Sequence, residues 1–459
     1  MTTLPHWRGS TAIETLGSGF YQPVDAAHFP STELRWRNDR AADTVGLAGL
    51  SDEAWVAHFA RFEPLPDSLA RPLALAYHGH QFRVYNPQIG DGRGFLLAQG
   101  TARDGRLMDL GTKGSGRTPF SRSGDGRLTL KGAVREILAT ERLEALGVPT
   151  SRTLSVVETG EALMRGDEPS PTRSAVLVRL SHGHIRIGSF QRLATIGDEA
   201  GLRALTDYSL RRLYDITPGA HPALNLLERV VERTAWLAAS YMVAGFVHGV
   251  LNSDNINVTG ESFDYGPWRF APTWEPGFTA AYFDEGGLYA FGRQAEAILW
   301  DVAQLARSLM PLEPVEALAE RLDAFAATYR TALGAQAAWR LGVEVPAEGG
   351  AVFGEALESA LVESRVPLDR FWRDWCGGAP AVRAGYEGEA FDRLAGLCTA
   401  TGGVVALPED GGLLIEEVER IWSAVEGADD WTLLDAAVAA NRRLGDTLNM
   451  GAASPAVAR

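Results

Sequence analysis

The stretch His248-Gly-Val-Leu-Asn-Ser-Asp-Asn255, with Asp264-Tyr-Gly266 beginning nine residues after Asn255, decides the fold of this 459-residue chain. Asn255 and Asp264 offer an amide oxygen and a carboxylate. Two oxygen ligands are a sparse set, typical of Mg²⁺ sites that take their remaining ligands from phosphates and water. The stretch therefore predicts a metal site that handles a phosphorylated molecule.

The order of these residues matches the motifs of a protein-kinase active site, which read H-R-D-x-x-x-x-N and then D-F-G. His248 takes the place of the His, Asn255 that of the metal-binding Asn, and Asp264 that of the metal-binding Asp. Val250 stands where a kinase carries its catalytic Asp. Asp254 is the candidate replacement base, the alternative being that it only caps a turn. The metal-binding half of a phosphotransfer site is thus present, and its usual base is absent.

A lysine and a glutamate upstream have the order and spacing of the kinase pair that contacts ATP. Lys113 lies 23 residues before Glu136. Residues 130–146 carry apolar side chains at helical spacing and end before Gly147, so Glu136 lies on a predicted helix. In kinases, a lysine on a strand contacts the ATP phosphates and is held by a glutamate from such a helix. Either residue alone is more often a solvated surface group, and it is their order relative to the downstream motif that favours the pair.

Two glycine-rich turns and two arginines also indicate anion binding. Gly90-Asp-Gly-Arg-Gly94 precedes an apolar run at 95–99, and a second Gly-Asp-Gly-Arg spans 124–127. Glycines allow a backbone to approach phosphates closely, and their N–H groups can cradle anion oxygens. Arg179 ends an apolar strand and Arg186 follows it closely, a placement that suits a bound anion. Plain tight turns and structural salt bridges are the alternatives.

The spacing of apolar residues changes near residues 181–195, from short apolar runs typical of strands to a helical period. The prediction is an α+β, protein-kinase-like fold of two lobes, with a β-rich N-lobe containing one helix and a large α-helical C-lobe with a C-terminal helical extension. Residues 1–75 are expected to form an irregular lead-in with short helices. The predicted divisions are 1–75, 76–190, 191–335 and 336–459. Helical segments are expected at 201–216, 222–244, 290–310, 314–335, 353–366 and 414–425.

The composition of the chain limits the kinds of partner that it can bind. The net charge of −15 argues against nucleic acid, because phosphate backbones need basic surfaces. Residues 91–192 carry 16 Lys/Arg against 11 Asp/Glu, a local balance of +5 that suits a small polyanion in a cleft or, alternatively, a solvated basic face. No run of 18 apolar residues and no apolar signal core is present, so no membrane association is expected. Two cysteines and no C-x-x-C favour the cytoplasm.

Together these residues resemble the selenoprotein O family of pseudokinase protein adenylyltransferases. The resemblance rests on 90–93, 109–146, 175–191 and 248–291, and covers roughly residues 15–310. It implies transfer of AMP from ATP to Ser, Thr or Tyr hydroxyls of proteins, self-labelling included, with Mg²⁺ or Mn²⁺ and with ATP turned so that its α-phosphate faces the acceptor. The implied base is Asp254 and the implied metal ligands are Asn255 and Asp264, with Glu136 supporting Lys113. The implied nucleotide contacts are Gly90, Gly92, Arg93, Lys113, Asp125, Gly126, Arg179, Arg186 and Asp264.

The chain departs from the family pattern at two places. Many members carry a selenocysteine or cysteine near the C-terminus, sometimes with a partner cysteine in the activation segment, whereas here residues 452–459 lack one and Thr279 stands at the second place. We therefore expect no redox clamp of that kind. The second departure is Arg83-Val-Tyr-Asn-Pro87, which stands before the glycine loop where the family is usually small and aromatic, so the family does not fix the shape of the cleft lip here. Two other functions stay open: a kinase that transfers the γ-phosphate, and an ATP-binding scaffold without turnover.

Overall fold

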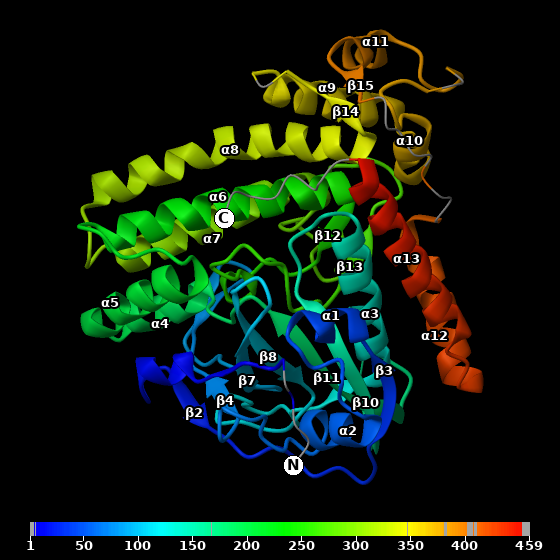
Figure 1. The fold of residues 1–459 in the computed structure, drawn as a ribbon. Helices are drawn as coiled ribbons and strands as arrows, with labels where there is room; N and C mark the ends of the chain where they lie inside the picture. The colour runs from blue at the N-terminus through cyan, green and yellow to red at the C-terminus, as the bar shows by residue number, and fades with distance from the viewer. Residues whose placement is uncertain are drawn as a thin grey trace.

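A computed structural model describes residues 4, 6–166, 168–346, 348–380, 383–401, 407 and 411–451. The chain forms a lobe built on a large sheet and a lobe built of helices, stacked one above the other in Figure 1. Residues 452–459, on which the expectation of a missing terminal cysteine rests, lie outside the described residues. No described helix combines the length and the apolar character needed to cross a bilayer.

The sheet of the first lobe is antiparallel and nine-stranded. Its central strands carry the predicted site: Lys113 ends β8, and Arg179 of β11 lies opposite Gly111 of β8. This register places both cations on neighbouring strands near one end of the sheet. In spatial order the strands are β2 (Tyr21–Pro23), β4 (Leu73–Leu75), β7 (Leu96–Thr101), β8 (Leu107–Lys113), β11 (Thr172–Ser181), β10 (Arg152–Leu163) and β3 (Glu33–Arg37), with β1 (Gly9–Ser10) beside β7 and β9 (Leu128–Thr129) beside β11.

The N-terminal residues differ from the expected irregular lead-in. The short helices are confirmed as α1 (Asp39–Thr44) and α2 (Asp52–Phe59), but β1 to β4 also join the sheet. These strands are only two to five residues long, too short to show an alternating pattern in the sequence. Trp55 of α2 is fully buried and its indole N–H donates to Ser155 Oγ on β10 at 2.7 Å. The described part of residues 1–75 is therefore continuous with the sheet lobe.

One helix packs on the sheet and carries Glu136. This helix, α3 (Leu130–Ala145), matches the predicted span of 130–146. Thr129 caps its start by accepting a hydrogen bond from the Gly132 N–H at 3.1 Å. Its buried Val134, Ile137 and Leu138 join the main core. The packing leaves Glu136 only 1 % exposed and fixes it behind Lys113.

The second lobe is mainly helical. Two short paired strands, β12 (Phe246–His248) and β13 (Trp268–Phe270), begin and end the segment that holds the motif residues, so this segment is a loop clamped at both ends. The predicted helix at 222–244 is confirmed to the residue as α6. The other helices are α4 (Ile187–Thr195), α5 (Glu199–Tyr208), α7 (Gln294–Leu309), α8 (Val315–Leu341), α9 (Gly350–Ser364), α10 (Leu368–Asp374) and α11 (Glu389–Gly396). A hairpin pairs β5 (Gly79–Gln81) with β6 (Val84–Asn86), and β14 (Val343–Glu344) pairs with the distant β15 (Thr399–Ala400).

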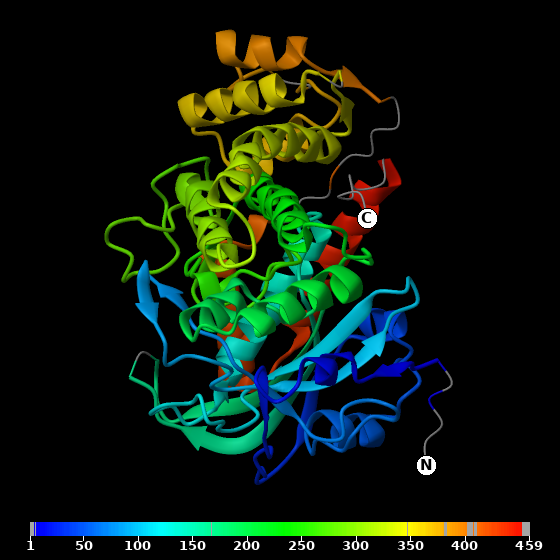
Figure 2. The ribbon, with the colours of Figure 1, turned by 90° about the vertical axis from the view of Figure 1, so that its left-hand side faces the viewer.

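The last two helices, α12 (Ile415–Ala428) and α13 (Thr432–Gly451), return to the sheet lobe and lie along α3 (Figures 1 and 2). Arg442 donates to both carboxylate oxygens of Glu141 on α3, at 2.7 and 2.8 Å. Helix α8 runs without a break through residue 336, where the last division was predicted. The C-terminal region is therefore bound to the helix that holds Glu136.

Candidate active site

A cavity of about 670 Å³ is lined by the glycine-rich turn at 90–94 and by Asp254 of the loop at 249–255, which we name the catalytic loop after its place in the kinase motif. Its lining comes from the sheet lobe, from both Gly-Asp-Gly-Arg turns and from the motif segment. Glu136 and Asn255 are the two predicted site residues that are not part of the lining. The predicted residues that line it are Gly90, Gly92, Arg93, Lys113, Asp125, Gly126, Arg179, Arg186, Asp254 and Asp264.

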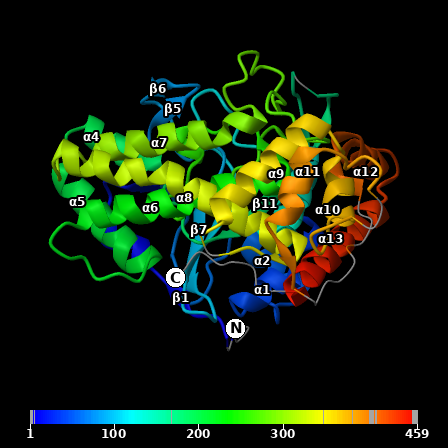
Figure 3. The same cartoon turned by 90° about the horizontal axis from the view of Figure 1, so that it is seen from above.

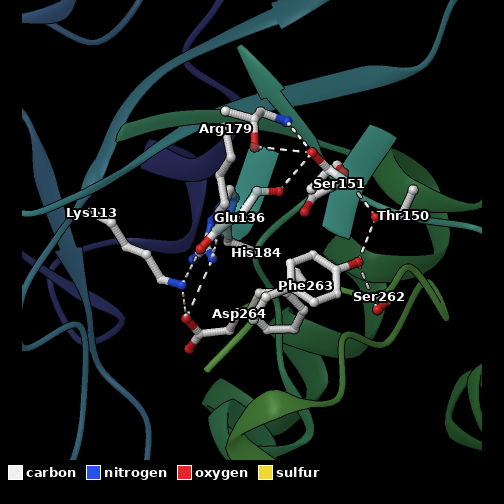
Figure 4. Close-up of polar contacts among 12 residues, drawn as sticks. Lys113, Glu136, Thr150, Ser151, Arg179, His184, Ser262, Phe263 and Asp264 are labelled. Atoms are coloured by element: carbon white, nitrogen blue, oxygen red, sulfur yellow. Dashed lines mark hydrogen bonds and ion pairs between the residues drawn. The ribbon is translucent and has the colours of Figure 1, made fainter. Parts of the chain in front are cut away.

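Asp264 is the centre of a cluster of cations in this cavity (Figure 4). Lys113 Nζ lies 2.8 Å from Asp264 Oδ1 and 2.5 Å from Glu136 Oε2. Arg179 Nη1 lies 3.6 Å from Asp264 Oδ1, and Arg186 Nη1 lies 3.7 Å from Asp264 Oδ2. Although burial opposes it, the charges of Lys113, Arg179 and Arg186 hold the pKa of Asp264 well below its usual range. Asp264 is therefore a permanent anion facing an excess of positive charge.

Arg186 connects three parts of the site. Its side chain is almost completely buried, between the rings of Tyr77 at 4.3 Å and Phe263 at 4.8 Å. Nη2 donates to Asp91 Oδ1 of the glycine-rich turn at 3.1 Å, and Nη1 donates to the Asp254 carbonyl oxygen at 3.0 Å. The planar guanidinium thus connects the glycine-rich turn to the catalytic loop across the cavity.

Asp254 lies in a single 3₁₀ turn, η3 (Ser253–Asn255), and is 7 % exposed. Burial raises the pKa of its carboxyl to about 6, against the opposing charge of Arg186. Its Oδ1 atom has no hydrogen-bond partner within the described part of the chain. A carboxylate with a pKa just below neutrality in the wall of a cavity is suited to accept a proton.

His248 joins the two motif segments without carrying charge. Its Nδ1 accepts a hydrogen bond from the Val250 N–H at 3.3 Å, and its Nε2 lies 3.2 Å from the Phe263 carbonyl oxygen, so Nε2 bears the proton. Burial lowers the pKa of His248 to about 4, which keeps the ring neutral near pH 7. The histidine is a structural link between the catalytic loop and Asp264.

The donor set around the loop suits a hard divalent cation that shares its coordination with phosphate. Asn255 Nδ2 donates to the Val250 carbonyl oxygen at 3.0 Å, which leaves the amide oxygen as the free acceptor. Among the described residues, no group of three or more His, Cys, Asp or Glu side chains could hold a metal ion. The oxygens of Asn255 and Asp264 would therefore need phosphate oxygens and water to complete a Mg²⁺ or Mn²⁺ site.

Several residues of the cavity were not predicted from the sequence as part of the site. Asp91, inside the first glycine-rich turn, pairs with Arg186. His184 accepts a hydrogen bond from Arg179 Nε at 3.2 Å and lies 3.3 Å from Asp109. These partners orient the arginines, and no spacing rule in the sequence signals them. Arg165, also in the cavity wall, donates to both carboxylate oxygens of the predicted contact Asp125, at 2.8 and 3.2 Å.

Comparison with known proteins supports the nucleotide-transfer site that this geometry indicates. A family model described as Protein adenylyltransferase SelO matches residues 6–375. The chain belongs to the SelO family. This confirms the resemblance to selenoprotein O drawn from the motifs.

Individual relatives extend the match within the SelO family. The chain is 46 % identical to the protein nucleotidyltransferase YdiU of Synechocystis sp. over 362 residues, which cover 77 % of this chain and 74 % of the relative. It is 41 % identical to the protein of the same name from Gloeobacter violaceus over 454 residues, 92 % of each chain. A solved kinase domain of a Toxoplasma gondii rhoptry antigen covers 64 % of this chain and 84 % of that domain, with 14 % identity and a TM-score of 0.28, too low to bear on the fold.

Proposed function

We propose that this chain transfers AMP from ATP to Ser, Thr or Tyr hydroxyls of proteins and releases pyrophosphate. The family is one of protein adenylyltransferases. The observation that carries the proposal is the cluster of Lys113, Arg179 and Arg186 around Asp264 in the cavity. The cluster lies next to a catalytic loop in which Val250 replaces the usual catalytic Asp. The cluster supplies more fixed positive charge than a kinase lysine alone.

The cations explain why the α-phosphate would be the one attacked. When an acceptor oxygen bonds to the α-phosphorus, the bond to the bridging oxygen breaks and pyrophosphate leaves with its charge. Lys113 and Arg179 are buried and held by Glu136 and His184, so they need no rearrangement to stabilise that charge. Arg93, which also lines the cavity, adds a further cation. This arrangement supports ATP lying with its β- and γ-phosphates deep among these residues.

Asp254 would accept the proton of the acceptor hydroxyl. Its pKa of about 6 leaves it mostly ionised at pH 7, and Asp254 lines the cavity in which the acceptor hydroxyl would meet the nucleotide. Asn255 and Asp264 would hold Mg²⁺ or Mn²⁺. Bound there with the nucleotide, the ion would neutralise phosphate charge and favour departure of pyrophosphate.

The partners follow from this chemistry. ATP and a protein hydroxyl are the substrates, and we propose that the chain's own hydroxyls are among the acceptors. The net charge of −15 gives no support to nucleic acid. ATP consumption fits a reaction in the cytoplasm, and so do Cys376 and Cys398, which form no disulfide.

The test is ATP labelled at the α- or the γ-phosphate, supplied with Mg²⁺ or Mn²⁺ and a mixture of proteins. Transfer of the α label alone is the expected result. Transfer of the γ label would make the chain a kinase. Stabilisation by ATP with neither label transferred would make it a nucleotide-binding scaffold.

A further inference from the structure

A short hairpin that no motif predicted is bonded to the catalytic loop. This hairpin joins β5 to β6 over residues 79–86 and lies near α4 and α7 in Figure 3. The backbone N–H of His80 donates to Ser253 Oγ at 2.7 Å, and that of Phe82 donates to Asn252 Oδ1 at 3.0 Å. The two residues that precede Asp254 are therefore both held by the hairpin backbone.

Side chains from other elements close this network. Ser253 Oγ donates to Gln191 Oε1 of α4 at 2.6 Å, and Gln191 Nε2 donates to His80 Nδ1 at 2.6 Å. Burial lowers the pKa of His80, which keeps Nδ1 available as an acceptor. Tyr289 Oη adds a second hydrogen bond to Asn252 Oδ1, at 2.7 Å. Ser253 is completely buried, so each lost bond would leave a buried polar group without a partner.

The hairpin turn is strained, and the strain is held by contacts near the loop. Phe82 and Arg83 both have positive φ, 50° and 62°. A two-residue turn of this kind normally uses Asn-Gly, because other side chains cost roughly 1–2 kcal/mol per residue in this conformation. The Phe82 ring packs against Tyr289, with centroids 5.0 Å apart. Strain of this kind persists where the surroundings fix the backbone, and it gathers at functional sites.

Gly79 forms the wall against which the Asp254 carboxylate lies. A Cβ at residue 79 would lie 3.0 Å from Asp254 Cβ and 3.1 Å from its Oδ1. Gly79 is not among the residues with positive φ, so its missing side chain matters for space alone. The same oxygen, Oδ1, is the one without a hydrogen-bond partner among the described residues. Gln81, next but one along the hairpin, lines the cavity together with Asp254.

We propose that the β5–β6 hairpin is the element that positions Asp254 for proton transfer, with Gly79 and Ser253 as positioning residues. The hairpin fixes the loop through Asn252 and Ser253, and Gly79 sets the side from which the carboxylate is approached. This proposal rests on the proposed function, because it assumes that Asp254 is the base. The hairpin's described backbone hydrogen bonds to the loop go to Ser253 and Asn252, and not to the Lys113 cluster.

The test is Gly79→Ala, assayed by transfer of α-labelled AMP to protein. The Cβ requires Asp254 to shift by a few tenths of an ångström, which should lower kcat about tenfold. The KM for ATP should change less than about twofold, since the triphosphate cluster is untouched. Gly19→Ala is the matched control, because a Cβ there meets nothing within 4 Å. Ser253→Ala, which removes one bond on each side of the network, should lower kcat roughly tenfold with the same unchanged KM.

A double-mutant cycle distinguishes positioning from general damage. If Gly79 acts through Asp254, Gly79→Ala should add less than about twofold to the loss already caused by Asp254→Ala. An undiminished kcat in Gly79→Ala, or an equal further loss in the Asp254→Ala background, would overturn the proposal. Failure of the proposed function gives a different result, because the wild-type chain would then transfer no α label at all.

Discussion

Replacement of Arg186 by lysine keeps the charge of the site but removes its geometry. The guanidinium donates through separate nitrogens to Asp91 Oδ1 at 3.1 Å and to the Asp254 carbonyl oxygen at 3.0 Å. A lysine ammonium at this position can keep one of these bonds, since its single nitrogen cannot span both. It also loses the flat stacking between Tyr77 and Phe263.

The loss can be sized from these contacts. A hydrogen bond to a charged group contributes about 1.5–3 kcal/mol, and Arg186 is too buried for water to replace it. One lost bond with the weakened stacking comes to about 2–3 kcal/mol. Because 1.4 kcal/mol is a factor of ten, kcat/KM for ATP should fall roughly 30- to 150-fold in Arg186→Lys.

The assay is AMP transfer from α-labelled ATP over a range of ATP concentrations, with thermal unfolding of the same samples. Arg192→Lys is the matched control, since Arg192 is partly exposed and makes one hydrogen bond, to the Gly19 carbonyl oxygen at 2.9 Å. The control should stay within about twofold of wild type. Retention of at least a third of wild-type kcat/KM in folded Arg186→Lys would refute the bridging role of the guanidinium.

Four further outcomes are expected. Asp254→Ala should lower the rate by about 10²–10⁴-fold if Asp254 is the general base. Asp264→Ala, or a chelator added to the wild type, should abolish AMP transfer, measured with α-labelled ATP. Burial lowers the pKa of His248 to about 4 in the folded chain, against an ordinary value of 6.5, so the unfolded chain binds this proton first as the pH falls. The buried ring should therefore make the free energy of unfolding about 2 kcal/mol lower at pH 5 than at pH 7. Urea unfolding of His248→Gln should not show this loss. Arg442→Ala leaves the buried Glu141 without its two charged hydrogen bonds and should lower the free energy of unfolding by about 1–3 kcal/mol.

Each of these outcomes has a clear contrary result. Unchanged turnover in Asp254→Ala removes that residue as the base, and wild-type activity in Asp264→Ala removes the metal assignment. An equal loss of stability between pH 7 and 5 in His248→Gln would mean that other groups titrate. The control for Arg442 is Arg40→Ala, whose pair with Asp446 is exposed on both sides and should contribute less than about 1 kcal/mol.

Local patterns predicted the elements whose cause is local. Helix α3 was predicted because its signals are local: the apolar spacing lies within the helix and Gly147 follows just after its end. The pairing of Lys113 with Glu136 was found because order along the chain reflects the fold. The close approach of Lys113, Arg179 and Arg186 to Asp264 follows from strand register, which places β8 beside β11.

Features that depend on distant contacts were not predictable. Strands β1 to β4 are stabilised by pairing across the sheet and carry little pattern of their own. The return of α13 to α3 depends on the pair of Arg442 with Glu141, which are 301 residues apart. The β5–β6 hairpin has Phe82 and Arg83 at the two turn positions that usually carry Asn-Gly, so no signal in the sequence marks this turn.

The central claim is that the chain transfers the α-phosphoryl group with its adenosine, and not the γ-phosphate. The most direct measurement compares protein-bound label after incubation with Mg²⁺ or Mn²⁺ and ATP labelled at either phosphate, with Asp264→Ala alongside. The account predicts α label on protein, no γ label, and neither in Asp264→Ala. Transfer of the γ label, or α label that survives in Asp264→Ala, would contradict it.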